Sequence, residues 1–183
     1  MKSYKKQFID GIINVEGGYA NDPDDSGGET NWGVTKRVAR KSGYRGSMRF
    51  MSREVAFAIY SDLYWDELNL DEVEKLAPTI AQELADTGVN QGTDRAAEFL
   101  QRSLNVLNDR ERLYNDIIVD GDIGPATLRA FRAYLKKRKR KGETVLFNML
   151  NCLQGAFYVT LAERREKDER FVYGWFDHRI KLT

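Results

Sequence analysis

The stretch NVEGGYANDPDDSGGETNWGVT, from Asn14 to Thr35, decides the fold because a helical pattern ends in it and a glycine-rich acidic loop begins. Upstream, apolar side chains recur at the spacing of one helical face. These residues are Tyr4, Phe8 and Ile12, with Ile9 and Ile13 beside them. Glu16 closes the stripe, and the two glycines after it predict the end of the helix. The last residues of the stretch, ETNWGVT, predict a short strand or hairpin.

Further helical patterns downstream predict a mainly α-helical chain. The predicted helices cover approximately residues 52–68, 79–92, 93–107, 125–135 and 144–168. Ser52 is the predicted cap of the first, and Thr93 or Asp94 caps the third. Pro125 suits the first turn of the fourth helix, which is expected to dissolve in the basic run KKRKRKG. The segment FVYGWFDHRI is predicted to be a short aromatic end piece that docks on the body.

Composition excludes several classes of function. Lys and Arg total 29 and Asp and Glu total 28, so the net charge of +1 predicts no nucleic-acid partner. A single Cys152 and a single His178 leave no zinc cluster and no internal disulfide, so we expect no metal, no cofactor and a reducing compartment. No apolar run reaches the ~20 residues of a membrane span, which predicts no stable membrane insertion. The basic start lacks the apolar region of a signal peptide, which predicts cytoplasmic synthesis.

The acidic loop partly matches a calcium-binding pattern. Asp22, Asp24, Ser26 and Gly27 occupy positions one, three, five and six of an EF-hand loop. Position twelve is Gly33, where the pattern requires a bidentate glutamate. The sequence therefore disfavours calcium, and a solvated turn rich in Asp and Gly is the simplest alternative.

Glu16 has the position of a general acid. A carboxylate at a helix C-terminus faces the negative end of the helix dipole, and on an apolar stripe it also loses solvation. Both effects favour the protonated form, which a general acid must keep near neutral pH. Glycoside hydrolysis pairs such an acid with a second carboxylate. Asp25, nine residues later, is the first choice, and the rivals are Asp22, Asp24 and Glu29.

Other residues of the loop suit the same chemistry. The hydroxyl of Thr30 is a candidate for holding the attacking water. The rings of Tyr19 and Trp32 are candidates for stacking on sugars while keeping the acid dry.

The segment EGGYANDPDDSGGETNWGVT resembles the signature of glycoside hydrolase family 108, muramidases found among phage endolysins and in toxin secretion. That resemblance implies that Glu16 is catalytic. The arrangement is also similar to phage lysozymes in which a Glu at a helix end, an Asp nine residues later and a Thr in the following hairpin form the site. Glu16 and Asp25 keep this step, whereas Thr30 falls one residue early.

The second half resembles the predicted peptidoglycan-binding domain associated with that family. The resemblance rests on IIVDGDIGPATLRAF, residues 117–131, and on the stretch from Asn151 to Arg179. It implies a catalytic region at residues 1–92 and a peptidoglycan-binding helical region at residues 93–183, packed into one globule. DGDIGPAT also reads simply as a turn before a helix.

Together these observations predict a lysozyme-like helical fold with a short hairpin or irregular loop at the active site. The expected function is hydrolysis of the β-1,4 bond between N-acetylmuramic acid and N-acetylglucosamine in bacterial peptidoglycan. The expected substrate-binding residues are Tyr19, Asn21, Asp22, Trp32, Asn90, Gln91 and Tyr158.

Two alternatives remain open at this stage. One is a lytic transglycosylase, which needs only Glu16, and the other is a noncatalytic peptidoglycan-binding or secretion adaptor. After synthesis in the cytoplasm, the protein is expected to reach the periplasmic or extracellular wall through a holin or a secretion machinery.

Overall fold

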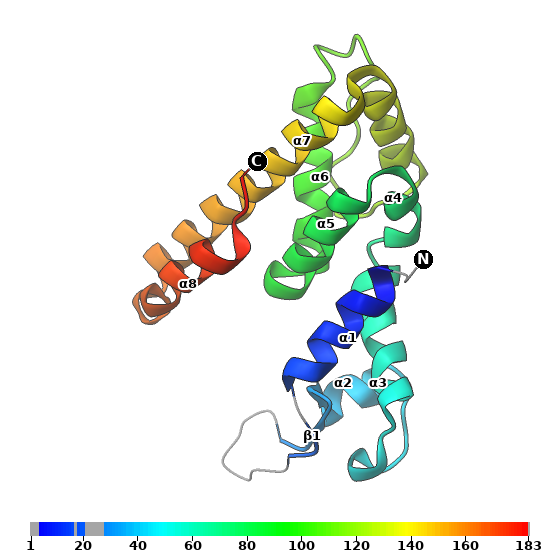
Figure 1. Ribbon diagram of the computed structural model, residues 1–183, viewed down its shortest axis with the longest axis vertical. Helices are drawn as coiled ribbons and strands as arrows, with labels where there is room; N and C mark the ends of the chain where they lie inside the picture. Colours follow the sequence, from blue (N-terminus) through cyan, green and yellow to red (C-terminus); the bar gives the residue numbers. More distant parts are fainter. Residues whose placement is uncertain (1–3, 17, 21–27, 183) are drawn as a thin grey trace. The chain divides into compact units, whose positions relative to one another are not determined.

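The computed structural model describes residues 4–16, 18–20 and 28–182, the side chains of Val15 and Glu16 excepted. The chain divides into two compact units, with the boundary between Glu67 and Leu68 (Figure 1). Helices dominate both units, and the strands among the described residues form one two-stranded antiparallel sheet. The predicted mainly α, lysozyme-like fold is confirmed. Each unit is described by itself.

Unit 1 begins with helix α1, Tyr4–Glu16. Its buried face is centred on Ile9 and Ile13, which are both 0% exposed, whereas Tyr4 at the start of the predicted stripe is 36% exposed. These isoleucines join a core with residues of the hairpin and of the following helices. The predicted helix is confirmed. Its most buried residues are Ile9 and Ile13, whereas Phe8 and Ile12 of the predicted stripe are only half-buried.

A short hairpin follows, formed by β1, Thr30–Asn31, and β2, Val34–Thr35. Both residues of its loop have positive φ, 54° at Trp32 and 75° at Gly33, as a two-residue type I′ hairpin requires. Positive φ is costly for a bulky residue. Two hydrogen bonds hold Trp32 in place, from its Nε1 to the Met51 carbonyl at 2.9 Å and from the Tyr60 hydroxyl to its own carbonyl at 3.1 Å.

Helix α2, Lys36–Lys41, follows the hairpin, and the sequence patterns did not predict it. Three further helical segments complete unit 1. These are the 3-10 turn η1, Met48–Phe50, helix α3, Arg53–Tyr60, and the π-helical segment η2, Ser61–Asp66. The Ser52 hydroxyl accepts a hydrogen bond from the Val55 amide, so its predicted capping role is confirmed.

Unit 2 is built from helices. They are α4, Leu70–Leu76; α5, Pro78–Gln91; α6, Thr93–Leu107; α7, Pro125–Arg164; the 3-10 turn η3, Glu166–Asp168; and α8, Glu169–Arg179. Helices α5, α6 and α7 pack on one another, and α8 folds back along α7 (Figure 1). Gly92 occupies the cap position of α6 without a side-chain hydrogen bond, so the cap predicted at Thr93 or Asp94 is wrong.

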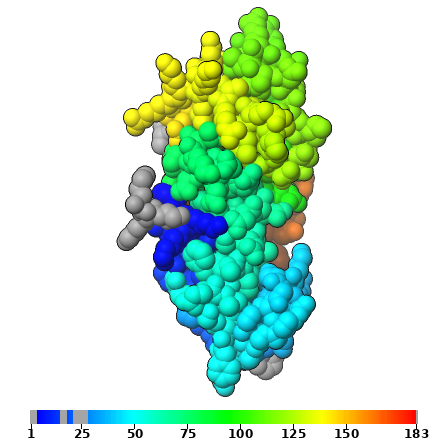
Figure 2. Space-filling model, turned by 90° about the vertical axis from the view of Figure 1, so that its right-hand side faces the viewer, coloured from blue at the N-terminus to red at the C-terminus, as the bar shows by residue number. Residues whose placement is uncertain are grey.

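The predicted break at the basic run is confirmed, and it lies at Lys139. Two helical stretches of α7 meet there in a kink, because the φ of 54° and ψ of −149° at Lys139 are not helical, and both stretches extend further into the run than predicted. The cations of this run are all exposed, and Figure 2 shows long side chains of this yellow segment extending from the surface. Mutual repulsion of these charges is relieved by solvent, so helical residues can lie on both sides of the kink.

Helix α7 also contains a window apolar enough to cross a membrane, with a hydropathy of 1.4 and 39% of the window buried in the protein. A buried apolar face is the ordinary property of a core helix. The predicted absence of stable membrane insertion stays a prediction.

The irregular segment between α6 and α7 is organised by the buried side chain of Gln101. Its Oε1 accepts hydrogen bonds from the amides of Asp120 and Gly121 at 3.1 and 3.0 Å. Its Nε2 donates to Asp120 Oδ1 at 2.7 Å, to the Asp122 carbonyl at 2.8 Å and to Thr127 Oγ1 at 3.2 Å. The polar groups of the DGDIGPAT motif are therefore largely used within the fold, which supports its interpretation as a turn before a helix.

Candidate active site

The candidate site begins at the C-terminal end of α1. Glu16 is the last residue of this helix, seven positions after Ile9 and three after Ile13. Residues at these spacings share one helical face, so Glu16 occupies a position on the buried side of α1. Its side chain lies outside the description, as do Asn21, Asp22, Asp24 and Asp25 entirely.

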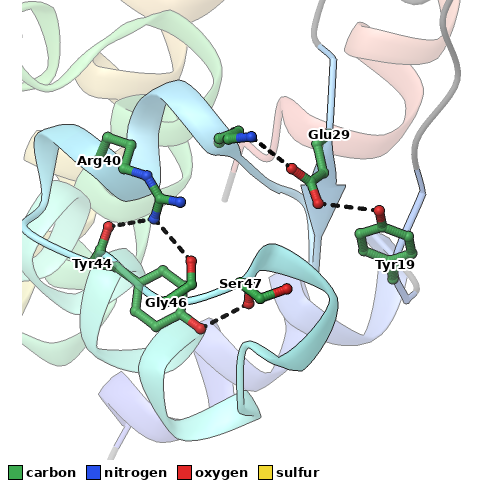
Figure 3. Close-up of polar contacts among 7 residues, drawn as sticks. Tyr19, Glu29, Arg40, Tyr44, Gly46 and Ser47 are labelled. Atoms are coloured by element: carbon green, nitrogen blue, oxygen red, sulfur yellow. Dashed lines mark hydrogen bonds and ion pairs between the residues drawn. The ribbon is translucent and has the colours of Figure 1, made fainter.

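The two ends of the acidic loop are fastened together. Ala20 and Thr30 form an antiparallel bridge, with hydrogen bonds of 2.9 Å from each amide to the other residue's carbonyl. One residue earlier on each side, the Tyr19 hydroxyl donates to Glu29 Oε1 at 3.1 Å (Figure 3). We call these two interactions the loop clamp. The loop clamp joins the two ends of the loop that contains Asp25. Its backbone bridge begins at Ala20, four residues after the end of α1.

Glu29 is held on both carboxylate oxygens. Oε1 accepts the Tyr19 hydroxyl, and Oε2 lies 3.0 Å from Nζ of Lys36, the first residue of α2. The hydrogen bond from Lys36 lowers the pKa of Glu29, and the Tyr19 hydroxyl lowers it further. Burial raises the pKa of Tyr19, and the hydrogen bond to Glu29 adds to the increase. Arg49 lies over the Tyr19 ring, 5.3 Å from its centroid.

The segment at residues 40–48 is held by hydrogen bonds from side chains to backbone carbonyls. Arg40 donates from one guanidinium nitrogen to the carbonyls of Tyr44 and Gly46 at 2.7 and 3.0 Å, and the Tyr44 hydroxyl donates to the Ser47 carbonyl at 2.9 Å (Figure 3). The next residue, Met48, offers its carbonyl to Nδ2 of Asn31 at 2.7 Å. These bonds give the hairpin a rigid support, as a site that must hold substrate and water requires.

Two of the residues predicted for the site lie in this hairpin. Thr30 is half-buried and pairs through its backbone with both Ala20 and Thr35. Trp32 is also half-buried, and its indole N–H is already used by the Met51 carbonyl. Any sugar contact of Trp32 therefore uses its ring face.

The other predicted binding residues belong to unit 2. Asn90 is exposed and donates to the Asp86 carbonyl at 2.7 Å within α5, and Gln91 donates to the Gln154 carbonyl at 3.2 Å. Tyr158 is 2% exposed, and its ring stacks on Trp175 with centroids 4.7 Å apart. Helix capping and packing between helices account for these three positions.

The chain is similar to known proteins in both sequence and fold. Residues 9–92 match the family model described as glycosyl hydrolase 108, and residues 95–180 match the model described as a predicted peptidoglycan domain. The structure of Brucella abortus SagA resembles this chain in fold, with a TM-score of 0.63 and 23% identity over 97% of this chain and 90% of that one. No curated protein matches the sequence.

The fold and the two family matches together define a lysozyme-like glycoside hydrolase that acts on peptidoglycan. Residues 9–92 belong to glycosyl hydrolase family 108, and a predicted peptidoglycan domain follows at residues 95–180. Its place of action is the bacterial cell wall. The first family match extends past the boundary between the units and includes α4 and α5. The division of functions at residue 92 stays a prediction.

The sequence did not reveal two features. One is the pair of contacts that Glu29 makes with Tyr19 and Lys36, because the sequence offered Glu29 only as a rival for the second carboxylate. The other is a buried polar cluster in unit 2 around Glu83, Asn151 and Gln154. The sequence did contain a signal for this polar cluster. Polar residues interrupt the apolar patterns of α5 and α7 at helical spacing.

Proposed function

We propose that this protein is an N-acetylmuramidase that hydrolyses the β-1,4 bond between N-acetylmuramic acid and N-acetylglucosamine. Glu16 is the general acid that protonates the leaving oxygen. Asp25 is the second carboxylate, acting as base on water if the enzyme inverts, and Thr30 holds that water. Inversion requires the carboxyl groups to lie ~6.5 to 9.5 Å apart, and retention requires ~5 to 5.5 Å.

The observation that carries this proposal is the loop clamp. Because Ala20 and Thr30 are bridged, the loop bearing Asp25 leaves and returns at a point four residues from Glu16. The two ends of this loop thus meet at one bridged pair of residues, which is the attachment that a second carboxylate beside Glu16 requires. This arrangement supports a two-carboxylate site at that end.

The state of Glu29 supports Asp25 as the second carboxylate. Both oxygens of Glu29 are engaged, by Tyr19 and by Lys36, and these contacts lower its pKa, which makes Glu29 a weaker base toward a water. Glu29 is thus a positioning residue that keeps the loop closed. The remaining rivals, Asp22 and Asp24, belong to the same loop sequence. Replacing each aspartate in turn distinguishes them from Asp25.

The decisive experiment analyses purified peptidoglycan digested by the wild type and by Glu16→Gln, with mass spectrometry of the products. We expect wild-type products with a reducing end that carries an added water, and a loss of about 10²- to 10⁴-fold in rate for the variant. Glu67→Gln is the matched control, because Glu67 is an exposed glutamate of the same unit. It should cleave at the wild-type rate.

Other outcomes reject parts of the proposal. An anhydromuramyl end identifies a lytic transglycosylase instead of a hydrolase. Equal lysis by wild type and Glu16→Gln rejects the catalytic assignment, and the absence of lysis by either protein favours a binding or adaptor role. Release through a holin or a secretion machinery stays a prediction.

A further inference from the structure

A charged pocket lies in unit 2, apart from the candidate active site. It has a volume of about 250 Å³ and lies between α5, α7 and the end of α8. Its polar lining consists of Thr79, Gln82, Glu83, Asp86, His178, Arg179 and Lys181. We call this the α5–α8 pocket. Figure 1 shows α8 and the chain end running back along α7, which brings these segments together.

Glu83 is the unusual member of this lining. It is 6% exposed, and its Oε1 has no hydrogen-bond partner among the described residues. The pKa of Glu83 is raised to about 7, mainly by burial; the hydrogen bond from Asn151 opposes this increase, the charge of Asp86 contributes to it, and Lys181 opposes it. An unpartnered buried carboxyl oxygen is destabilising unless a ligand supplies a donor. The pocket thus contains an acceptor suited to a cationic donor.

Positive charge also lines the same pocket. Arg179 forms a 3.1 Å ion pair with Oδ1 of Asp86, and both side chains are more than a third exposed. The backbone amide of Lys181 donates to Oδ1 of Asn151 at 2.7 Å, which holds the chain end against α7. The pocket therefore combines the unpartnered carboxyl oxygen of Glu83 with basic side chains, and its volume suits one small ligand.

The walls of the pocket are fixed by buried amides. Gln154 is 0% exposed and donates from Nε2 to Oδ2 of Asp86 and to Oγ1 of Thr87, both at 3.2 Å. Asn151, also 0% exposed, connects α7 to the chain end. A pocket whose charged groups are held by such contacts loses little entropy when a ligand binds.

We propose that the α5–α8 pocket binds a zwitterionic amino-acid end group, whose ammonium donates to Glu83 and whose carboxylate is held by Lys181 and Arg179. The inference rests on the proposed function, since the stem peptides of peptidoglycan carry such groups. A neutral sugar would leave both charges unused. A metal ion is disfavoured because the described residues contain no group of three metal-ligating side chains.

The test uses the full-length protein and a sugar-free tripeptide that ends in meso-diaminopimelic acid, which has a free ammonium and carboxylate on its side chain. Isothermal titration calorimetry measures its binding to wild type and variants. We expect Glu83→Gln to weaken binding about tenfold or more, as for a lost hydrogen bond to a charged group. Lys181→Gln should also weaken it, and this exposed side chain can be replaced without disturbing the core.

Matched controls separate this site from the active site. Glu163→Gln changes an exposed glutamate of α7 that does not line the pocket, and it should bind like the wild type. The same tripeptide acetylated on its side-chain amine should bind as weakly as the unmodified peptide binds Glu83→Gln. A sugar-only chitotriose should not compete with the tripeptide.

The outcomes distinguish the two proposals. Equal binding of the tripeptide by wild type, Glu83→Gln and Lys181→Gln overturns the pocket assignment, as does the absence of binding by the wild type at millimolar concentration. Glu16→Gln should bind the tripeptide normally. If it does so while the wild type fails to cleave the wall, the proposed function fails and the pocket assignment stands.

Discussion

Tyr19 donates a 3.1 Å hydrogen bond from its hydroxyl to Oε1 of Glu29, ten residues further along the chain. Beside this contact, Ala20 and Thr30 pair through two backbone hydrogen bonds. The acidic loop is therefore closed at its base by one side-chain pair and one backbone pair. These contacts fix the two described ends of the loop, and the proposed chemistry depends on their integrity.

Replacing Tyr19 by Phe should slow wall cleavage without abolishing it. The variant loses the hydroxyl that holds Glu29, whereas the Ala20–Thr30 bridge and the aromatic ring remain. We expect a decrease of about threefold to tenfold, the range for one lost hydrogen bond. Turbidity clearance of purified cell wall measures the rate.

Tyr4→Phe is the control, because it makes the same chemical change on a tyrosine at the far end of α1. It should leave the rate unchanged. A Tyr19→Phe enzyme as fast as the wild type would show that the bridge alone closes the loop.

The two carboxylates at residues 25 and 29 should respond differently to neutralisation. Asp25→Asn should lower hydrolysis by about 10²-fold or more, as for loss of a catalytic base. Glu29→Gln should lower it by less than about tenfold, because the amide can still accept the Tyr19 hydroxyl while the Lys36 ion pair is lost. Product analysis on the same wall preparation compares both variants. The reverse order of effects would assign the second carboxylate to Glu29.

Glu83 predicts a pH dependence of stability in unit 2. Below its ordinary pKa of 4.5 the group is protonated in folded and unfolded chains, and the stability is fully present. As pH rises toward the folded pKa of about 7, the unfolded chain ionises first and the folded state loses about 3 kcal/mol. The charged groups that face Glu83 are Asp86, His178, Arg179 and Lys181.

Urea unfolding at pH 5 and pH 8 measures this loss for wild type and Glu83→Gln. The variant cannot ionise at this position, so its stability should fall less over the same interval. Glu163→Gln, in which an exposed glutamate is changed, should follow the wild type. Parallel curves for wild type and Glu83→Gln would show that the carboxyl titrates normally.

Patterns that depend on local spacing predicted much of the fold. The end of α1 at Glu16, the hairpin, the Ser52 cap and the start of α7 at Pro125 are all confirmed. Each is decided by short-range chemistry, such as a capping hydroxyl or the missing amide of proline. The same local signals identified the segment that holds the candidate site.

Features that depend on distant contacts were not predictable. The helix predicted at residues 144–168 forms the second part of α7, and its buried residues include the polar Asn151 and Gln154. Periodicity counts apolar residues, and it cannot show that a buried amide finds its partners on α5 and the chain end. The α5–α8 pocket and the Tyr19–Glu29 contact escaped prediction for this reason.

The kink of α7 leads to the last prediction. Lys139 has a φ of 54° and a ψ of −149°, a region that glycine occupies far more readily than lysine. Lys139→Gly should therefore stabilise unit 2 by about 1 kcal/mol, because the gain from relieved strain exceeds the entropy lost by glycine. Lys137→Gly, two residues earlier in regular helix, should destabilise it by about 1 kcal/mol. Urea unfolding of both variants measures the two changes, and destabilisation of equal size in both would show that α7 passes through Lys139 without a kink in solution.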